Sequence, residues 1–272
     1  MKDRCRWSVG GDYHWMAAFP GPFVKWPRGH LVWMSAGRHA IPLLQTVAGP
    51  KARLWVPLYF CGEVAEYWKR FIELRFYEDD PRWDEPRWET LTPAREDLVL
   101  AVNYFGIRDG TVWNKWRKRN TCVLVEDHSH DPCSPWARKS AGDYAFASLR
   151  KTLPLPEGGL LWSPRGLRMP ETPTAPSVGT AERLAGMLLK AEFLKGEAGD
   201  AAWNPVYREL FREGESKLAA SCPAAMSRLT RTVLAKGVPQ KWLKQRRANT
   251  ALVHLLSPGR TVASHGPGFA VP

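Results

Sequence analysis

The chain has 272 residues, of which 44% are hydrophobic and 14 are tryptophan, so it can bury a substantial core and is not a disordered protein. Its five cysteines are odd in number and form no Cys-x-x-Cys pair, so neither a disulfide framework nor a cysteine zinc site is indicated. A formal net charge of +12 attracts anions, either nucleic acid or phosphate-bearing small molecules. No stretch has the character of a signal peptide or the length of a membrane span, so we expect a cytoplasmic protein.

The first third of the chain predicts an arm followed by alternating helices and strands. Residues 1–33 carry Gly, Pro and Trp without periodic spacing, and we expect an extended N-terminal arm there. Gly37 and Arg38 then precede an amphipathic helix from Ala40 to Val47. A glycine that opens a helix lets backbone N–H groups approach an anion. We expect the next elements to be a strand over 54–57, a loop with Tyr59 and Phe60, a helix over 63–72 and a strand over 74–77.

The middle of the chain continues the alternation. Residues 78–89 combine many acids with two prolines and predict an exposed loop. Short apolar runs predict buried strands over 97–103, 122–125, 144–149 and 159–162, with a helix over 112–118 before the second of them. Strands alternating with helices predict right-handed crossovers. We therefore expect an α/β domain over 34–179, with a mostly parallel central sheet flanked by helices.

An acid and a lysine each follow a predicted strand. Asp127 ends one strand, and Lys151 follows another together with Ser148. Ligands of open α/β sheets gather beyond the carboxyl ends of strands. Taken alone, each residue has a simpler explanation, a loop cap for Asp127 and a solvated charge for Lys151. Together they suit pyridoxal phosphate, which needs a lysine to hold it and a carboxylate to keep its ring nitrogen protonated.

The motifs around these residues resemble those of the DegT/DnrJ/StrS family of sugar aminotransferases. They are EDHSH at 126–130, GD at 142–143, FASLRK at 146–151 and EGG at 157–159. The family pattern is an E-D-x-x-[QH] strand end, a G-D-x-x-x-F-S strand, a lysine and an E-G-G turn. The chain departs from it at Ser148, which lies closer to the lysine than the family serine does. The resemblance implies the large domain of a fold-type-I, pyridoxal-phosphate enzyme, with a homodimer as its assembly.

The resemblance also implies a role for each candidate site residue. Lys151 would hold the cofactor as an imine and move the proton, and Asp127 would pair with its ring nitrogen. His130 would contact the ring hydroxyl, and either Tyr59 or Phe60 would stack on the ring. The phosphate would bind at Gly37, Arg38 and Ser148. The implied reaction moves an amino group, with glutamate as the donor, to a nucleotide-linked keto-sugar, as in polysaccharide or antibiotic-sugar synthesis.

The second half of the chain differs in character and leaves alternatives open. Residues 164–179 are Pro-rich and predict a linker, and helices are predicted over 180–197, 209–217, 223–235 and 238–256. We expect residues 180–272 to be a helical segment followed by the start of a truncated small domain at 269–272. Basic runs at 113–119 and 241–247 allow nucleic-acid binding, although such runs more often form solvated helix faces. The other alternative is a catalytically inactive or fragmentary relative that binds the cofactor weakly or not at all and acts as a binding protein.

Overall fold

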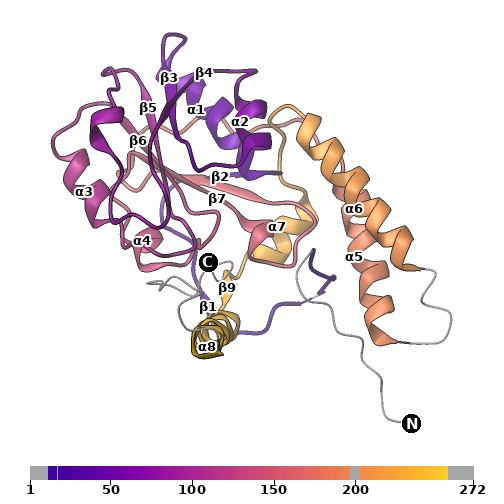
Figure 1. Cartoon of the computed structure of the whole chain (residues 1–272). Coiled ribbons are helices and arrows are strands. Elements are labelled where there is room, and N and C mark those ends of the chain that lie inside the picture. The colour runs from indigo at the N-terminus through magenta and orange to yellow at the C-terminus, as the bar shows by residue number, and fades with distance from the viewer. Residues whose placement is uncertain (1–11, 17, 197–202, 257–272) are drawn as a thin grey trace.

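A mixed seven-stranded sheet lies at the centre of the molecule in the computed structural model, which describes residues 12–16, 18–196 and 203–256 (Figure 1). The strand order is β2-β8-β7-β6-β5-β3-β4. Only β8 runs antiparallel to its neighbours β7 and β2, so the sheet is mostly parallel as predicted. The strands are β2 (Leu31–Met34), β3 (Arg53–Pro57), β4 (Glu73–Tyr77), β5 (Leu98–Val102), β6 (Val123–Asp127), β7 (Tyr144–Ser148) and β8 (Gly159–Trp162).

Helices cover both faces of this sheet. One face packs against the helical segment formed by η1 (Gly37–His39) and α1 (Ala40–Ala48), and against α2 (Gly62–Trp68). The other face packs against α3 (Thr111–Arg117) and α4 (Pro135–Arg138) at the β3–β6 end. At the β7–β8 end of that face lie α7 (Arg228–Leu234) and α8 (Gln240–Leu256). This three-layer arrangement explains the continuous apolar runs of the central strands, because a parallel strand is buried on both sides.

Alternation along single strands sends neighbouring residues to opposite layers. In β3, Leu54 and Val56 belong to the core beneath α1 and α2, and Trp55 belongs to the core beneath α3. In β6, Val125 belongs to the first core and Leu124 to the second. Asp127 therefore follows Val125 onto the α1–α2 side, because side chains alternate with a period of two. The candidate site is thus expected on that side of the sheet.

Three expectations for the N-terminal half need correction. The arm expected over 1–33 overlaps the sheet, because β2 begins at Leu31 and pairs along its length with β8. A second short ladder joins β1 (Phe23–Val24) to β9 (Val238–Pro239). The helix expected over 63–72 ends at Trp68. The loop over 78–89 contains no strand, but it is not wholly exposed, since Asp79 is buried against Arg108.

The second half contains a helical hairpin formed by α5 (Thr180–Lys195) and α6 (Trp203–Ala220), which projects to the right in Figure 1. The stretch 164–179 has no helix or strand, as expected for a linker. The buried face of α5 is not purely apolar: Arg183, Met187 and Lys190 are buried, and Leu188 is exposed. Arg183 and Lys190 have polar partners, namely the backbone oxygen of Pro156 for the former and that of Asp12 for the latter. The expected start of a small domain, 269–272, lies outside the described residues.

The two basic runs are helical, and their tryptophans do not form a common exposed surface. Trp113 of α3 is fully buried against Tyr77 and Trp88, and Arg117 of the same run pairs with the buried Asp143. Trp242 of α8 packs edge-on against Phe19. No helix among the described residues is long and apolar enough to span a membrane. The same residues contain no cluster of His, Cys, Asp and Glu suited to a metal ion.

Candidate active site

A cavity of about 400 Å³ opens at the carboxyl ends of β5, β6 and β7, on the α1–α2 side of the sheet. All eight residues predicted for the site line it, although they come from four separate segments of the chain. They are Gly37, Arg38, Tyr59, Phe60, Asp127, His130, Ser148 and Lys151. The volume lies within the range of cavities that bind small molecules and cofactors, about 300–1,000 Å³. Asp127 and Lys151 thus line the same cavity.

Asp127 is the last residue of β6, and the backbone around it is tied to the next strand. Its side chain is 7% exposed, and Oδ1 accepts the N–H of Ser129 at 2.8 Å. The hydroxyl oxygen of Ser129 in turn accepts the N–H of Ser148 at 2.9 Å. These two bonds fix the ends of β6 and β7 relative to each other. The carboxylate is thereby held in one orientation beside the cavity.

His130 lies between the charges of the acid and the lysine. Burial and the neighbouring charge of Lys151 lower the pKa of His130 to about 4, although Asp127 opposes this shift. Its Nδ1 accepts the N–H of Phe105 at 3.3 Å, and the two rings are stacked with centroids 4.5 Å apart. The imidazole is therefore neutral at physiological pH, with its proton on Nε2. The neutral ring lines the cavity together with Asp127 and Lys151.

The helix start at Gly37 is pressed against the ends of β7 and β8. A Cβ atom on Gly37 would lie 2.7 Å from the Cβ of Ser148, and one on Gly159 would lie 2.7 Å from the carbonyl of Ala36. The N–H of Gly158 also donates to the oxygen of Ser35 at 2.6 Å. The contact therefore has room for glycine only at both positions. It brings the amino end of the helical segment 37–48 to the same end of the cavity as Ser148.

Arg38 and Arg150 form the basic side of the cavity, and α6 holds both. The guanidinium Nη2 of each donates to Oε1 of Glu215 at 2.7 Å. Arg150 was not among the predicted site residues. The sequence signal available for Arg150 was its position directly before Lys151. Glu215, its partner, could not be found in this way, because it lies 65 positions further along the chain and belongs to no local motif.

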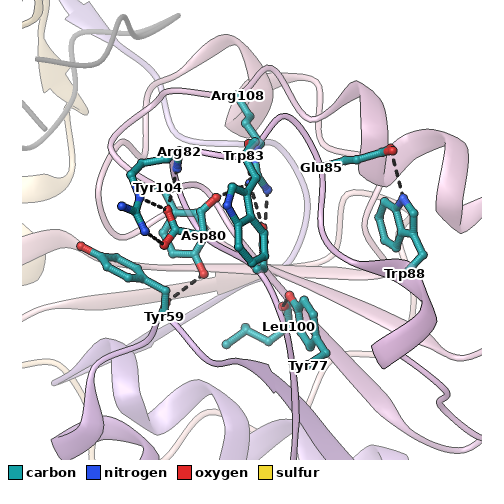
Figure 2. Close-up of polar contacts among 11 residues, drawn as sticks. Tyr59, Tyr77, Asp80, Arg82, Trp83, Glu85, Trp88, Leu100, Tyr104 and Arg108 are labelled. Carbon is teal, nitrogen blue, oxygen red and sulfur yellow. Dashed lines mark hydrogen bonds and ion pairs between the residues drawn. The ribbon is translucent and has the colours of Figure 1, made fainter. Parts of the chain in front are cut away.

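Aromatic residues form the opposite side of the cavity. Phe60 is stacked on Trp68 with ring centroids 5.1 Å apart, and this pair belongs to the core beneath α1 and α2. Tyr59 is 48% exposed and meets Tyr104 edge-on. Figure 2 shows the Tyr104 hydroxyl directed at the backbone of Tyr59, to whose carbonyl it donates at 2.9 Å. Of the two predicted aromatic residues, Tyr59 therefore has the more exposed ring, whereas the ring of Phe60 is stacked on Trp68.

Behind the site, on the opposite face of the sheet, lies a buried polar chain that sequence reasoning did not identify. His128 donates from Nε2 to Glu126 Oε2 at 3.0 Å and lies between the rings of Trp136 and Trp162. Its Nδ1 receives the amide of Asn103 at 3.2 Å. Strand alternation separates this chain from Asp127. We assign it to fixing the end of β6 rather than to the cavity.

Solved structures with a similar fold include sugar aminotransferases. A protein of Streptococcus pneumoniae assigned as a sugar aminotransferase, in its PMP form, matches with a TM-score of 0.51 and 13% identity, over 85% of this chain and 60% of that one. The synthase of 3-amino-5-hydroxybenzoic acid matches with a TM-score of 0.53 and 16% identity, over 85% of this chain and 57% of the other. A DegT/DnrJ/EryC1/StrS aminotransferase of Brucella abortus also matches, over 50% of this chain at 18% identity and a TM-score of 0.36.

These comparisons confirm the predicted fold. The mostly parallel sheet with flanking helices is shared with the Streptococcus pneumoniae protein and with the synthase of 3-amino-5-hydroxybenzoic acid. The chain spans about 60% of the length of the first of them. No protein-family model matches the sequence, and no curated protein matches it either.

Proposed function

We propose that the cavity binds pyridoxal phosphate and that the protein is an aminotransferase. The observation that carries the proposal is the convergence of Asp127, His130 and Lys151 on one cavity, with both charged groups acting on the pKa of the imidazole. The similarity to a sugar aminotransferase in its PMP form supports the same class of cofactor. Neither the acid nor the lysine alone would justify this conclusion.

The residues of the cavity fit such a cofactor at each of its functional groups. The buried carboxylate of Asp127 suits a protonated ring nitrogen, and the Nε2–H of His130 suits a ring hydroxyl. The amino end of the helical segment at Gly37 suits a phosphate, because backbone N–H groups and the helix dipole both favour an anion there. Ser148 and Arg38 supply further donors. The ring of Tyr59 is the better stacking candidate, since one face of Phe60 is already covered by Trp68.

Lys151 has two tasks in this proposal. Its amine would hold the cofactor, and its Nζ would serve as the base that holds and moves the proton during the transfer. Bound pyridoxal phosphate supplies the electron sink that makes this proton acidic. Asp127 keeps that sink effective by holding the ring nitrogen protonated. The neutral His130 orients the ring without adding a charge.

The substrates follow from the resemblance rather than from a contact. We propose glutamate as the amino donor and a keto-sugar, nucleotide-linked, as the acceptor. We also propose a homodimer, because sites of this fold type are completed by a second subunit. Light scattering of the cofactor-loaded protein should give twice the monomer mass. A monomer that keeps its cofactor would contradict the dimer without contradicting the cofactor site.

Borohydride trapping tests the central assignment. Protein loaded with pyridoxal phosphate should absorb visible light, and reduction should fix the cofactor to the peptide containing Lys151. Lys151→Ala should abolish the labelling, whereas Lys139→Ala, on the exposed surface beyond α4, should leave it intact. Asp127→Ala should weaken cofactor binding and stop turnover. Label on another lysine, or no label in folded and saturated protein, would refute the proposal. Label at Lys151 without transfer to any keto-sugar would instead favour a cofactor-binding relative that is not an aminotransferase.

A further inference from the structure

Three arginines converge on one glutamate beside the cavity. Arg38 and Arg150 share Oε1 of Glu215, and Arg183 of α5 donates to Oε2 at 3.2 Å. The arginine side chains are 7%, 15% and 5% exposed in that order, and Glu215 is 32% exposed. Arg183 has a second partner, Asp12, at 2.6 Å. One carboxylate therefore serves the buried guanidinium of Arg38 and the largely buried one of Arg150, which have no other carboxylate partner in the described part of the chain.

The charges of this region do not balance. The residues lining the cavity include three cations, Arg38, Arg150 and Lys151, and one carboxylate, Asp127. Adding Arg183, Glu215 and Asp12 still leaves four cations against three carboxylates. A buried charge is costly unless it is paired, so a surplus of positive charge beside a cavity favours an anionic ligand. A phosphate group carries a charge of about −1.5 to −2 near neutral pH, which suits such a surplus.

Arg150 offers a donor that the protein itself does not use. Its Nε is buried and has no hydrogen-bond partner among the described residues, while Nη2 is held by Glu215. Burial lowers the pKa of the Arg150 guanidinium, but an arginine keeps its charge in proteins. An unpaired N–H on a cation away from solvent is unfavourable, and because this Nε has no accessible surface a ligand would meet the outer nitrogens of the guanidinium instead. Arg150 lines the cavity, so its charge acts on a ligand bound there.

We propose that Arg150 binds an oxyanion in the cavity, specifically a phosphate group, and that Glu215 is the positioning residue that holds its guanidinium for this purpose. The proposal deepens the proposed function and rests on it for the identity of the molecule that carries the phosphate. That molecule is either the cofactor or the sugar substrate. The phosphate site itself can be measured on protein that has never been exposed to cofactor.

The first experiment measures binding of inorganic phosphate to cofactor-free protein by its effect on thermal unfolding. Phosphate should raise the midpoint with saturation, and Arg150→Met should weaken the apparent affinity about ten- to one-hundred-fold, the range expected for a hydrogen bond to a charged group. Arg150→Lys, which keeps the charge and loses the fork of donors, should weaken it less. The matched control is Arg212→Met, one turn before Glu215 on α6, where the side chain is 76% exposed. It should leave the affinity within about twofold, because exposed ion pairs contribute little.

The second experiment identifies the carrier of the phosphate by comparing pyridoxal phosphate with pyridoxal. If Arg150→Met weakens binding of the first and not of the second, the anion is the cofactor's. If it weakens neither, but removes binding of inorganic phosphate to the cofactor-loaded protein, the anion belongs to the substrate. Equal effects of Arg150→Met and Arg212→Met on phosphate, or no phosphate binding by the native protein, would overturn the inference. A phosphate site without any label on Lys151 would refute the proposed function alone.

Discussion

Removing the guanidinium of Arg108 should destabilise the protein strongly at neutral pH. Arg108 donates to both oxygens of Asp79, at 2.7 and 3.1 Å, and to the backbone carbonyls of Asp80 and Trp83. Figure 2 shows the last of these contacts, where Arg108 reaches over the loop that follows β4. The two side chains are 7% and 0% exposed. Arg108→Met would leave the Asp79 carboxylate buried and unpaired, which costs about 3–5 kcal/mol.

The sign of the pH dependence follows from Asp79. Burial already raises the pKa of this carboxyl, and the hydrogen bonds from Arg108 oppose that shift. Without Arg108 the folded-state pKa should rise further, while the unfolded chain keeps a pKa near 3.9. Between these two values the folded protein binds more protons than the unfolded chain. The variant should therefore lose stability as pH rises through this window, by up to about 1.4 kcal/mol per pH unit.

Urea unfolding at several pH values between 4 and 8 measures both effects. Arg108→Met should lose the most stability at pH 8 and the least at pH 4. Adding Asp79→Asn should recover about half of the loss at pH 7, because the amide carries no charge to bury. Arg82→Met is the matched control, since Arg82 is 74% exposed and pairs only with Asp80 among the described residues, and it should change stability by less than about 1 kcal/mol. A loss independent of pH, or no rescue by Asp79→Asn, would refute the reasoning.

Three further outcomes are expected. Gly37→Ala should destabilise the protein and weaken cofactor binding, because the new methyl group would overlap Ser148. The control Gly62→Ala should do neither, because its Cβ meets open space. Equal effects of the two substitutions would contradict the close contact at Gly37. Burial lowers the pKa values of His39 and His130 to about 4, so on acidification these histidines become protonated in the unfolded chain before they do in the folded protein. The free energy of unfolding should therefore fall as pH drops from about 6.5 to 4, by up to about 1.4 kcal/mol per pH unit for each histidine. NMR titration midpoints near 6.5 would contradict this. Binding to nucleic acid should be weak and lost near physiological salt, as measured by fluorescence anisotropy, and a salt-resistant, sequence-selective complex would favour a nucleic-acid-binding protein instead.

The sequence carried enough information for the central strands and for the positions of the acid and the lysine. The runs that became β5, β6 and β8 are apolar and short, and the turns between them contain glycine or proline, so their type was readable locally. Asp127 was recognisable because it ends one such run, and Lys151 because it comes three residues after the run that became β7. The glycine at position 37 was recognisable as the start of a helix whose backbone N–H groups an anion could approach. Its packing against Ser148 could not be seen in the sequence.

The parts that were missed depend on contacts between distant segments. β2 has four residues, too few to show alternation, and its identity comes from pairing with β8 more than 120 positions later. Asp79 lies in a stretch that is acidic and contains two prolines, so local composition predicted exposure, and its partner Arg108 lies 29 positions further along the chain. Glu215 appeared as one of many charges on a helix. Its importance arises only when α6 packs against the body and brings it to Arg38 and Arg150.

The placement of β8 between β2 and β7 has a consequence for biosynthesis. The ribosome releases β2 and the helical segment at Gly37 early, yet their neighbour in the sheet ends only at Trp162. Synthesis proceeds at about 5–20 residues per second, so this amino-terminal stretch waits for many seconds without a partner. The parallel strands β3 to β7 can associate during that interval. The cavity then closes at the end formed by Gly37 and Ser148, when β8 inserts and α6 arrives, so a nascent chain stalled before residue 159 would hold most of the sheet without the strand that packs against this end.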